Sequence, residues 1–212
     1  GHRVLNAVRD IAGLYILLTV LCMILLLLSG IPALDALCLA LATVSTGGFV
    51  PIDGNISDYA NPFAEVSLMV FMLLGATSIL WQRMLLLNRR QLLKNHRESY
   101  SVMLLAGGLG LLYALTLFDA AGSADVLHPL TALREGLFTA VSLVSTTGFE
   151  VRHAGFAVLP LTLVIFVALI GGGTFSTAGG LKHYRIGGML TQAYRELGRL
   201  VYPPGIRSAQ FG

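Results

Sequence analysis

Residues 44–49 read VSTGGF, and residues 144–149 read VSTTGF. Each stretch ends a short apolar run with a Thr-x-Gly-Phe turn, and each lies between two long hydrophobic segments. Irregular backbone at membrane depth is tolerated only where protein or a water-filled path satisfies its polar groups. The repeated order of long segment, short segment, glycine turn and long segment therefore predicts two loops that enter a bilayer and return.

The composition of the chain indicates a membrane protein. Its 212 residues are 55% hydrophobic and 12% charged, with a mean hydropathy of +0.77, whereas soluble domains carry about 25% charged residues. Cys22 and Cys38 lie in apolar stretches, so we expect small core residues rather than a disulfide. The five histidines show no ligand spacing, and no pair of acids lies in a span, so neither a metal site nor a catalytic pair is expected.

The charges are segregated along the chain. Twelve of the 14 basic residues precede the first long segment, lie between the two repeats or follow the last long segment. Eight of the 11 acidic residues lie on the sides that carry the glycine turns. By the positive-inside rule this pattern predicts a multi-pass plasma-membrane protein whose turns face outside. The basic residues mark topology, so no nucleic-acid partner is expected.

The first repeat, residues 1–100, is expected to hold two crossings and one half-length helix. Residues 11–30 can cross once, because about 20 helical residues span about 30 Å of hydrocarbon. Residues 34–45 form only about 18 Å of helix and can enter halfway. Asn61 is a good helix cap, and we expect a second crossing from there to about Gln82.

The second repeat, residues 101–212, is expected to follow the same plan. Residues 101–118 form its first crossing, residues 131–145 its half-length helix, and residues 155–170 the start of its last crossing. A helix near the end of the chain has apolar residues at helical spacing and basic residues on its other faces. This pattern predicts an amphipathic cytoplasmic or interfacial helix that stops at Pro203.

A glycine-rich stretch interrupts the last crossing. Five glycines within ten residues cannot hold a regular helix, because each costs about 1 kcal/mol relative to Ala. We expect a break at membrane depth and a helix that resumes near Leu181. Leu181 also separates Gly180 from Lys182, which excludes a phosphate-binding P-loop. The candidate gating residues are Gly171, Gly172, Gly173, Thr174, Phe175, Ser176, Thr177, Ala178, Gly179, Gly180 and Lys182.

Two plainer interpretations of this stretch stay open. It can be a helix kink that merely allows close packing, and Lys182 can be an anchor at the cytoplasmic edge of the membrane. Breaks within membranes, however, usually line a pathway.

The two turns have the chemistry of a cation filter. A cation that leaves water must recover its hydration energy from oxygen dipoles, and backbone carbonyls at a constriction supply them. Glycine permits the positive-φ conformations that aim successive carbonyls to one side, and the negative end of the preceding helix favours a cation. Plain extracellular turns are the alternative, but two matching copies argue against it. The expected ligands are the carbonyl oxygens of Thr46, Gly47, Gly48, Thr146, Thr147 and Gly148.

These motifs resemble those of the Trk/Ktr/HKT superfamily of potassium transporters, and most closely its bacterial TrkH-type subunits. The resemblance rests on residues 45–49, 145–149 and 171–182 and covers essentially the whole chain. In that superfamily, four helix–pore loop–helix repeats surround one pathway, and a glycine-rich break in the third repeat forms a gating loop. The resemblance implies an all-α integral membrane fold with two helix–re-entrant pore loop–helix repeats, half of a pseudo-fourfold pore, whose last transmembrane helix is broken by the Gly-rich stretch.

By this resemblance the chain matches the second and third repeats, with Gly48 and Gly148 at the filter-glycine positions. The transported ion is then K⁺, no covalent cofactor is needed and the chain is not an enzyme. Phe175 stands where the superfamily commonly has Gly, and its ring is expected to alter how the loop occludes the path. The implied partners are the remaining repeats of the same protein, a second identical subunit, a cytosolic nucleotide-binding regulatory subunit and the lipid bilayer of the bacterial inner membrane.

Two other functions stay open on the sequence. The chain can be a membrane enzyme that binds a phosphorylated or lipid substrate at the Gly-rich stretch, or a non-conducting scaffold half. Two loops cannot surround an ion alone, so we expect a fragment of a longer protein or a half that pairs with another copy.

Overall fold

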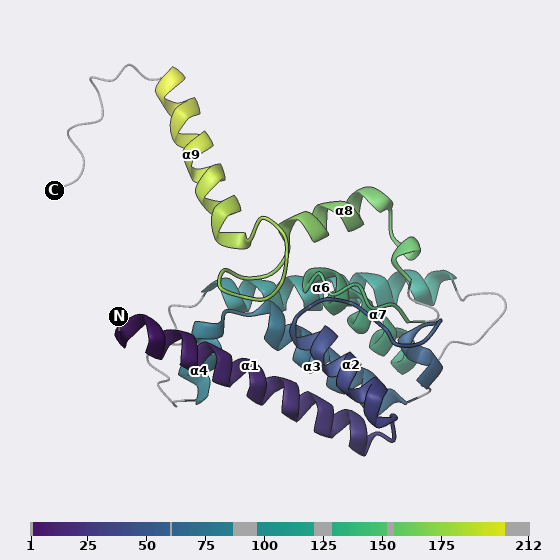
Figure 1. Cartoon of the computed structure of the whole chain (residues 1–212). Coiled ribbons are helices and arrows are strands. Elements are labelled where there is room, and N and C mark those ends of the chain that lie inside the picture. The colour runs from purple at the N-terminus through teal and green to yellow at the C-terminus, as the bar shows by residue number, and fades with distance from the viewer. Residues whose placement is uncertain (1, 60, 87–96, 121–128, 152–154, 202–212) are drawn as a thin grey trace.

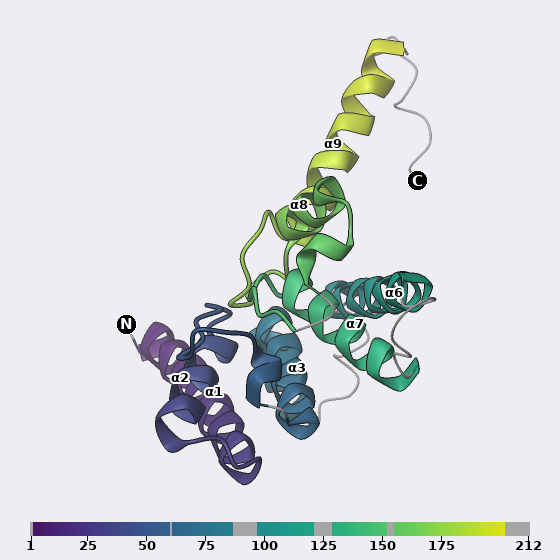
Figure 2. The same ribbon diagram turned by 90° about the vertical axis from the view of Figure 1, so that its right-hand side faces the viewer.

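The computed structural model describes residues 2–59, 61–86, 97–120, 129–151 and 155–201, and these ranges contain helices but no strand. Two long helices, α1 (His2–Leu28) and α6 (Arg97–Ala120), lie on opposite sides of the helical body (Figures 1 and 2). Shorter helices fill the space between them. The predicted all-α class is confirmed for these residues.

Within the described ranges, two helices are long and apolar enough to cross a membrane. They cover residues Val8–Leu28 and Glu98–Phe118, with mean hydropathies of 2.9 and 2.0. Only 11% of the first stretch and 33% of the second are buried inside the chain, whereas the core helix of a soluble protein is mostly buried. Most of their side chains are therefore exposed in this chain, and many of the exposed ones are large and apolar, as lipid contact requires.

The first repeat contains the expected short helix. After α1, Pro32 precedes α2 (Ala33–Val44), which packs back against α1. A short 3₁₀ turn, η1 (Ile56–Tyr59), leads to α3 (Pro62–Ala76). The Asn61 side chain accepts hydrogen bonds from the amides of the first turn of α3, so the predicted cap is confirmed.

The second crossing of this repeat is not one helix, and the prediction of a continuous segment to Gln82 was wrong. α3 ends at Ala76, and α4 (Ile79–Leu86) begins after a break at Thr77, where the backbone is extended (φ −88°, ψ 159°). The Gln82 amide group donates hydrogen bonds to the carbonyls of Leu74 and Thr77. These bonds satisfy part of the backbone that the break exposes, and the Gly-rich loop satisfies more of it.

The second repeat pairs α6 with α7 (Pro129–Val144) at close range. A Cβ atom on Gly136 would lie 2.8 Å from the amide nitrogen of Ala114 and 2.9 Å from the carbonyl oxygen of Gly110. The two backbones can therefore touch only because residue 136 has no side chain. This packing fixes the direction in which α7 presents its C-terminal end.

The last part of the chain consists of η2 (Phe156–Val158), α8 (Leu161–Ile170) and α9 (His183–Val201). The predicted crossing from residue 155 starts later, because the extended residue Leu159 and Pro160 precede the helix. α9 projects away from the other helices (Figures 1 and 2). The expected stop at Pro203 lies outside the described residues.

Candidate functional site

Loop 1 (residues 45–49) follows α2, and its amides bind carbonyls in the last turn of this helix. The amide of Gly47 donates to the carbonyl of Ala42 at 2.7 Å, and the amide of Thr46 donates to the carbonyl of Thr43 at 3.1 Å. This nested pair is a Schellman motif, which satisfies carbonyls at the end of a helix. The chain therefore turns sharply at Thr46 and leaves the helix axis.

Loop 2 (residues 145–149) repeats this arrangement at the end of α7. The amide of Thr147 donates to the carbonyl of Ser142 at 2.9 Å, and the amide of Thr146 donates to that of Leu143 at 3.1 Å. The repeat in the sequence is thus also a repeat of backbone geometry. Each short helix ends in the same turn.

The threonine of each turn adopts a left-handed backbone conformation. φ is 53° at Thr46 and 57° at Thr146, a region that β-branched residues rarely occupy. In both loops the threonine Oγ1 donates to the preceding carbonyl, that of Ser45 or Ser145, at 2.7 Å. The side-chain hydroxyl therefore stabilises the turn that its own Cβ atom disfavours.

Loops 1 and 2 meet at Gly48. A Cβ atom on Gly48 would lie 1.9 Å from the carbonyl oxygen of Thr147 and 3.7 Å from the Cα atom of Gly148. Gly48 also has a positive φ of 72°. No other residue type can bring loop 1 so close to loop 2 with this backbone conformation. The two predicted filter glycines are therefore neighbours in space.

Six carbonyl oxygens of these loops have no hydrogen-bond donor among the described residues. Val44, Ser45 and Ser145, which precede the turns, all accept hydrogen bonds from threonine hydroxyls. Among the described residues, no donor binds the carbonyls of Thr46, Gly47, Gly48, Thr146, Thr147 and Gly148. Their assignment as ion ligands stays a prediction.

The Gly-rich loop (residues 171–182) separates α8 from α9 and closes on itself. The amide of Leu181 donates to the carbonyl of Leu169 at 2.7 Å, and the amide of Lys182 donates to that of Ile170 at 3.1 Å. The end of the loop thus satisfies the last carbonyls of α8. The helix resumes at His183, close to the predicted position.

Glycines allow the two ends of this loop to touch. A Cβ atom on Gly171 would lie 2.1 Å from the carbonyl oxygen of Gly179, and one on Gly172 would lie 2.5 Å from the Cβ atom of Ala178. Gly171 and Gly180 also have positive φ values of 65° and 87°. The loop is therefore a compact fold rather than a simple kink between two helices.

The Gly-rich loop docks into the break between α3 and α4. The end of α3 offers free carbonyls and the start of α4 offers free amides, and the loop binds both. Backbone groups of the Gly-rich loop therefore satisfy the backbone groups that the α3–α4 break leaves free. The bonds run from Gly173 N to Ala76 O (2.8 Å), from Thr177 N to Gly75 O (3.1 Å) and from Ile79 N to Phe175 O (3.1 Å).

The Gly-rich loop also touches loops 1 and 2. The Thr177 hydroxyl donates to the carbonyl of Val44 at 2.9 Å, and the carbonyl of Thr177 accepts from Thr46 Oγ1 at 3.1 Å. In the second repeat, the amide of Gly179 donates to Thr146 Oγ1 at 2.7 Å. All three stretches that the sequence singled out are therefore in direct contact.

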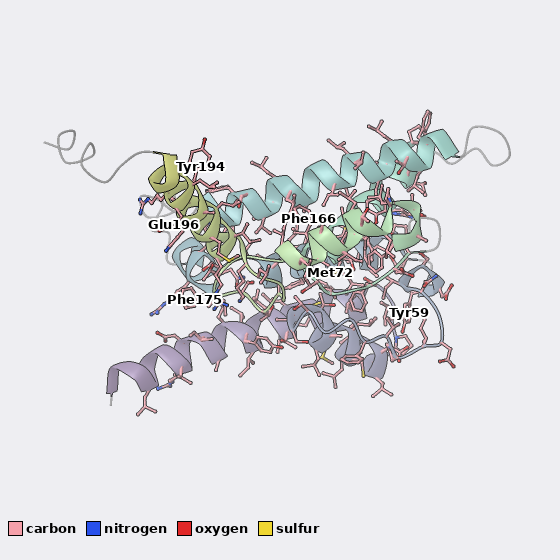
Figure 3. The ribbon with its side chains drawn as sticks, turned by 90° about the horizontal axis from the view of Figure 1, so that it is seen from above. Tyr59, Met72, Phe166, Phe175, Tyr194 and Glu196 are labelled. Atoms are coloured by element: carbon pink, nitrogen blue, oxygen red, sulfur yellow. The ribbon has the colours of Figure 1, made fainter. Side chains whose placement is uncertain are left out.

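Within the loop, polar side chains turn inward while Phe175 does not. Lys182 Nζ donates to the carbonyl of Ser176 at 3.3 Å, and Ser176 Oγ donates to the carbonyl of Gly173 at 2.5 Å. Phe175 is 66% exposed, and Figure 3 shows it apart from the core residue Met72. The Lys182 contact favours a role in the loop over a simple anchor.

Sequence reasoning missed one residue of this site, Glu98, in the first turn of α6. Its Oε1 atom accepts hydrogen bonds from the amide of Thr174 at 2.7 Å and from Thr174 Oγ1 at 2.6 Å. A signal was present, because Glu98 is one of three acids on the basic side of the charge pattern, with Asp10 and Glu196. Asp10 pairs with Arg83 at 2.7 Å.

Charged and polar contacts join elements at the far end of the molecule, where α1 ends and where Figure 3 shows Tyr59. Arg134 of α7 lies 2.9 Å from the carboxylate of Glu65 on α3, which ties the two repeats together. Tyr59 donates to Asp35 of α2 at 3.0 Å. Burial and this hydrogen bond raise the pKa of Tyr59 to about 12, so the phenol stays a donor at neutral pH.

Comparisons with known proteins agree on one family. The model of the family described as "TrkH: Cation transport protein" matches residues 3–212. The Trk system potassium uptake protein TrkH of Salmonella typhimurium is 31% identical over 99% of this chain. An uncharacterised cation transporter of Methanocaldococcus jannaschii is 30% identical over 94% of it.

A solved structure has the same fold. The crystal structure of the potassium transporter TrkH from Vibrio parahaemolyticus superposes on 97% of this chain with a TM-score of 0.80 and 27% identity. The chain spans less than half of these relatives: 43% of the Salmonella protein, 39% of the Methanocaldococcus protein and 44% of the Vibrio chain.

Proposed function

The chain belongs to the TrkH family of cation transport proteins, and from this premise we propose that it forms part of a membrane protein that carries K⁺ across the bilayer. The family consists of transporters rather than enzymes, which agrees with the prediction that the chain carries out no covalent chemistry. Its relatives in Salmonella and Vibrio are named potassium uptake or transport proteins.

In this proposal, loops 1 and 2 form two sides of a filter. The main support for this filter is the close approach of Gly48 to Thr147. Beside this contact lie six loop carbonyls that no described residue binds. A dehydrated K⁺ needs such oxygen dipoles around it. α2 and α7 add the negative ends of their dipoles, because each ends where its loop begins.

The Gly-rich loop is the proposed gate beneath this filter. It contacts Thr46 through Thr177 and Thr146 through Gly179, so its position depends on both filter loops. Its neutral hydrogen bonds to the α3–α4 break are individually worth about 0.5–1.5 kcal/mol. Such a set holds the loop in place yet allows it to move.

The proposed setting is a bacterial inner membrane. α2 and α7 are re-entrant helices, loops 1 and 2 face outside, and the basic connector lies in the cytoplasm. The remaining repeats of a longer protein complete the filter, because two loops cannot surround an ion. A second identical subunit and a cytosolic nucleotide-binding regulatory subunit are the further proposed partners.

A flux assay on the full-length protein tests this proposal. Purified protein in liposomes is expected to take up Rb⁺, as a tracer for K⁺, well above empty vesicles. Gly148→Asp places a carboxylate at the proposed filter and is expected to abolish the uptake or its preference for K⁺ over Na⁺. Uptake equal to that of empty vesicles, or uptake that Gly148→Asp leaves unchanged, contradicts the proposal.

A further inference from the structure

Glu98 binds the Gly-rich loop by a different kind of contact from the others. Its carboxylate accepts two hydrogen bonds from one residue, Thr174, whereas the loop's other contacts to the described helices and loops are between neutral groups. Hydrogen bonds to an ionised acceptor are roughly twice as strong as neutral ones. Glu98 is therefore the strongest single attachment that the described part of the chain offers to this loop.

The position of Glu98 is suited to holding the loop without touching the proposed ion path. It lies in the first turn of α6, and Figure 1 shows the Gly-rich loop over the end of α6 at which that helix begins. Its Cδ atom lies 3.9 Å from where a Cβ atom on Gly173 would stand. The described contacts of loops 1 and 2 are made by other residues, and Glu98 binds the Gly-rich loop rather than the filter loops.

We propose that Glu98 is a positioning residue that holds the Gly-rich loop closed through Thr174, so that release of Thr174 from its carboxylate is a step in opening. This inference rests on the proposed function. Two features make the step reversible. The contact is made by one side chain to one residue, and Gly173 directly before Thr174 and the glycines at the base of the loop let the backbone move.

Loss of the Glu98 carboxylate is expected to favour the open state. In full-length protein in liposomes, Glu98→Ala should raise the initial rate of Rb⁺ uptake by about tenfold, which corresponds to about 1.4 kcal/mol. Glu98→Gln keeps an acceptor oxygen but no charge, and should give a smaller increase. The ratio of Rb⁺ to Na⁺ uptake should not change, because the filter loops are untouched.

Thr174→Ala and Glu196→Ala provide the matched controls. Thr174→Ala removes one of the two bonds and should raise uptake less than Glu98→Ala, and the double variant should behave like Glu98→Ala alone. Glu196 lies on the exposed part of α9, where Figure 3 labels it. Glu196→Ala removes the same charge as Glu98→Ala and should leave uptake unchanged. A purely structural role for Glu98 predicts lost uptake instead.

Hydrogen exchange of the Thr174 amide gives a second measurement that does not depend on transport. Exchange should be faster in Glu98→Ala than in the wild type, while exchange of the Thr147 amide in loop 2 should not change. The inference is overturned if the wild type conducts and Glu98→Ala neither raises uptake nor speeds Thr174 exchange. If the wild type fails to conduct, the proposed function fails, and the exchange experiment still decides whether Glu98 holds the loop.

Discussion

At the residue scale, backbone strain is concentrated in the loops of the proposed site. The described residues contain four non-glycine residues with positive φ, namely Thr46, Thr146, Phe175 and Lys182. All four lie in loop 1, loop 2 or the Gly-rich loop. Such conformations cost about 1–3 kcal/mol each and persist only where the surroundings hold them. The hydroxyl bonds of the two threonines and the Lys182 contact are part of what holds them here.

Phe175 shows what this strain means for the sequence. The resemblance noted in the sequence leads us to expect Gly at this position, and the φ of 59° is a conformation that glycine adopts without strain. The backbone therefore keeps the glycine-like shape while the ring points outward and stays 66% exposed. The departure from the motif thus changes the surface of the loop more than its fold.

Gly48 provides the sharpest test at this scale. Gly48→Ala would place a Cβ atom 1.9 Å from the carbonyl oxygen of Thr147 and force an unfavourable positive φ, so loops 1 and 2 must separate. We expect the preference for Rb⁺ over Na⁺ uptake to be lost. The matched control is Gly47→Ala, because its Cβ atom would have side-chain atoms of loop 1 as its nearest neighbours, Ser45 Oγ at 3.2 Å and Phe49 Cδ2 at 3.4 Å, rather than the backbone of loop 2. Equal behaviour of the two variants would argue against the contact.

At the element scale, the paired breaks organise the site. The break between α3 and α4 exposes carbonyls and amides that the Gly-rich loop binds. The sequence showed one of these breaks, because glycines mark it, but not the other. Thr77 and Ser78 lie in an apolar run that contains a single glycine, Gly75, and no nearby Pro, so the sequence does not mark a break there. The partners that satisfy this break come from about 100 residues further along the chain.

The short helices, in contrast, could be predicted closely. α2 and α7 end at Val44 and Val144, within one residue of the predicted ends, because the glycine turns mark them. The charge pattern set Glu98 apart but could not assign it to the site, since its partner Thr174 is brought near only by tertiary structure. Local sequence signals therefore predicted where the loops lie, and only the three-dimensional fold showed how the loops contact each other.

Thr177 joins loop 1, α3 and the Gly-rich loop, and its hydroxyl is testable. Thr177→Val keeps the shape of the side chain but removes the donor to the carbonyls of Val44 and Gly75, both at 2.9 Å. The carbonyl of Gly75 keeps the backbone amide of Thr177 as a donor, but that of Val44 loses its donor, and a buried acceptor left without one costs about 1–3 kcal/mol. We expect a lower thermal unfolding temperature of the purified protein and faster exchange of the Gly173 amide.

The same substitution elsewhere serves as the control. Thr191 lies on the exposed surface of α9, where its hydroxyl donates to Gly187 one turn earlier at 2.8 Å. Thr191→Val should change neither measurement appreciably, because water can replace this bond. A Thr177→Val protein as stable as the Thr191→Val protein would show that the hydroxyl of residue 177 does not join these elements.

At the scale of the whole molecule, an ion pair ties the two repeats together. Glu65 is only 4% exposed beside Arg134, so Arg134→Leu should leave a buried carboxylate without its partner. Breaking a buried pair in this way costs about 3–5 kcal/mol. We expect a clear fall in the unfolding temperature.

The exposed pair between Asp10 and Arg83 is the comparison. Their side chains are 43% and 51% exposed, and such pairs contribute about 0–1 kcal/mol. Arg83→Leu should therefore unfold near the wild-type temperature. If the two variants lose similar stability, the Arg134 pair is not the buried link between the repeats.

The proposed membrane orientation predicts which residues face each side. In a background with Cys22→Ala and Cys38→Ala, a cysteine in place of the exposed Asp53 should react with a membrane-impermeant maleimide added to intact cells. A cysteine in place of Tyr194, which is 82% exposed on α9, should react only after the membrane is permeabilised. The reverse pattern would invert the topology.

In the proposed function, loops 1 and 2 bind a dehydrated cation with their main-chain oxygens. Crystals of the full-length protein grown with Rb⁺ in place of K⁺ test it directly, because anomalous scattering locates Rb⁺. We expect a peak bounded by carbonyls of residues 46–48 and 146–148. Rb⁺ bound only elsewhere along the path, with none at these carbonyls, would contradict it.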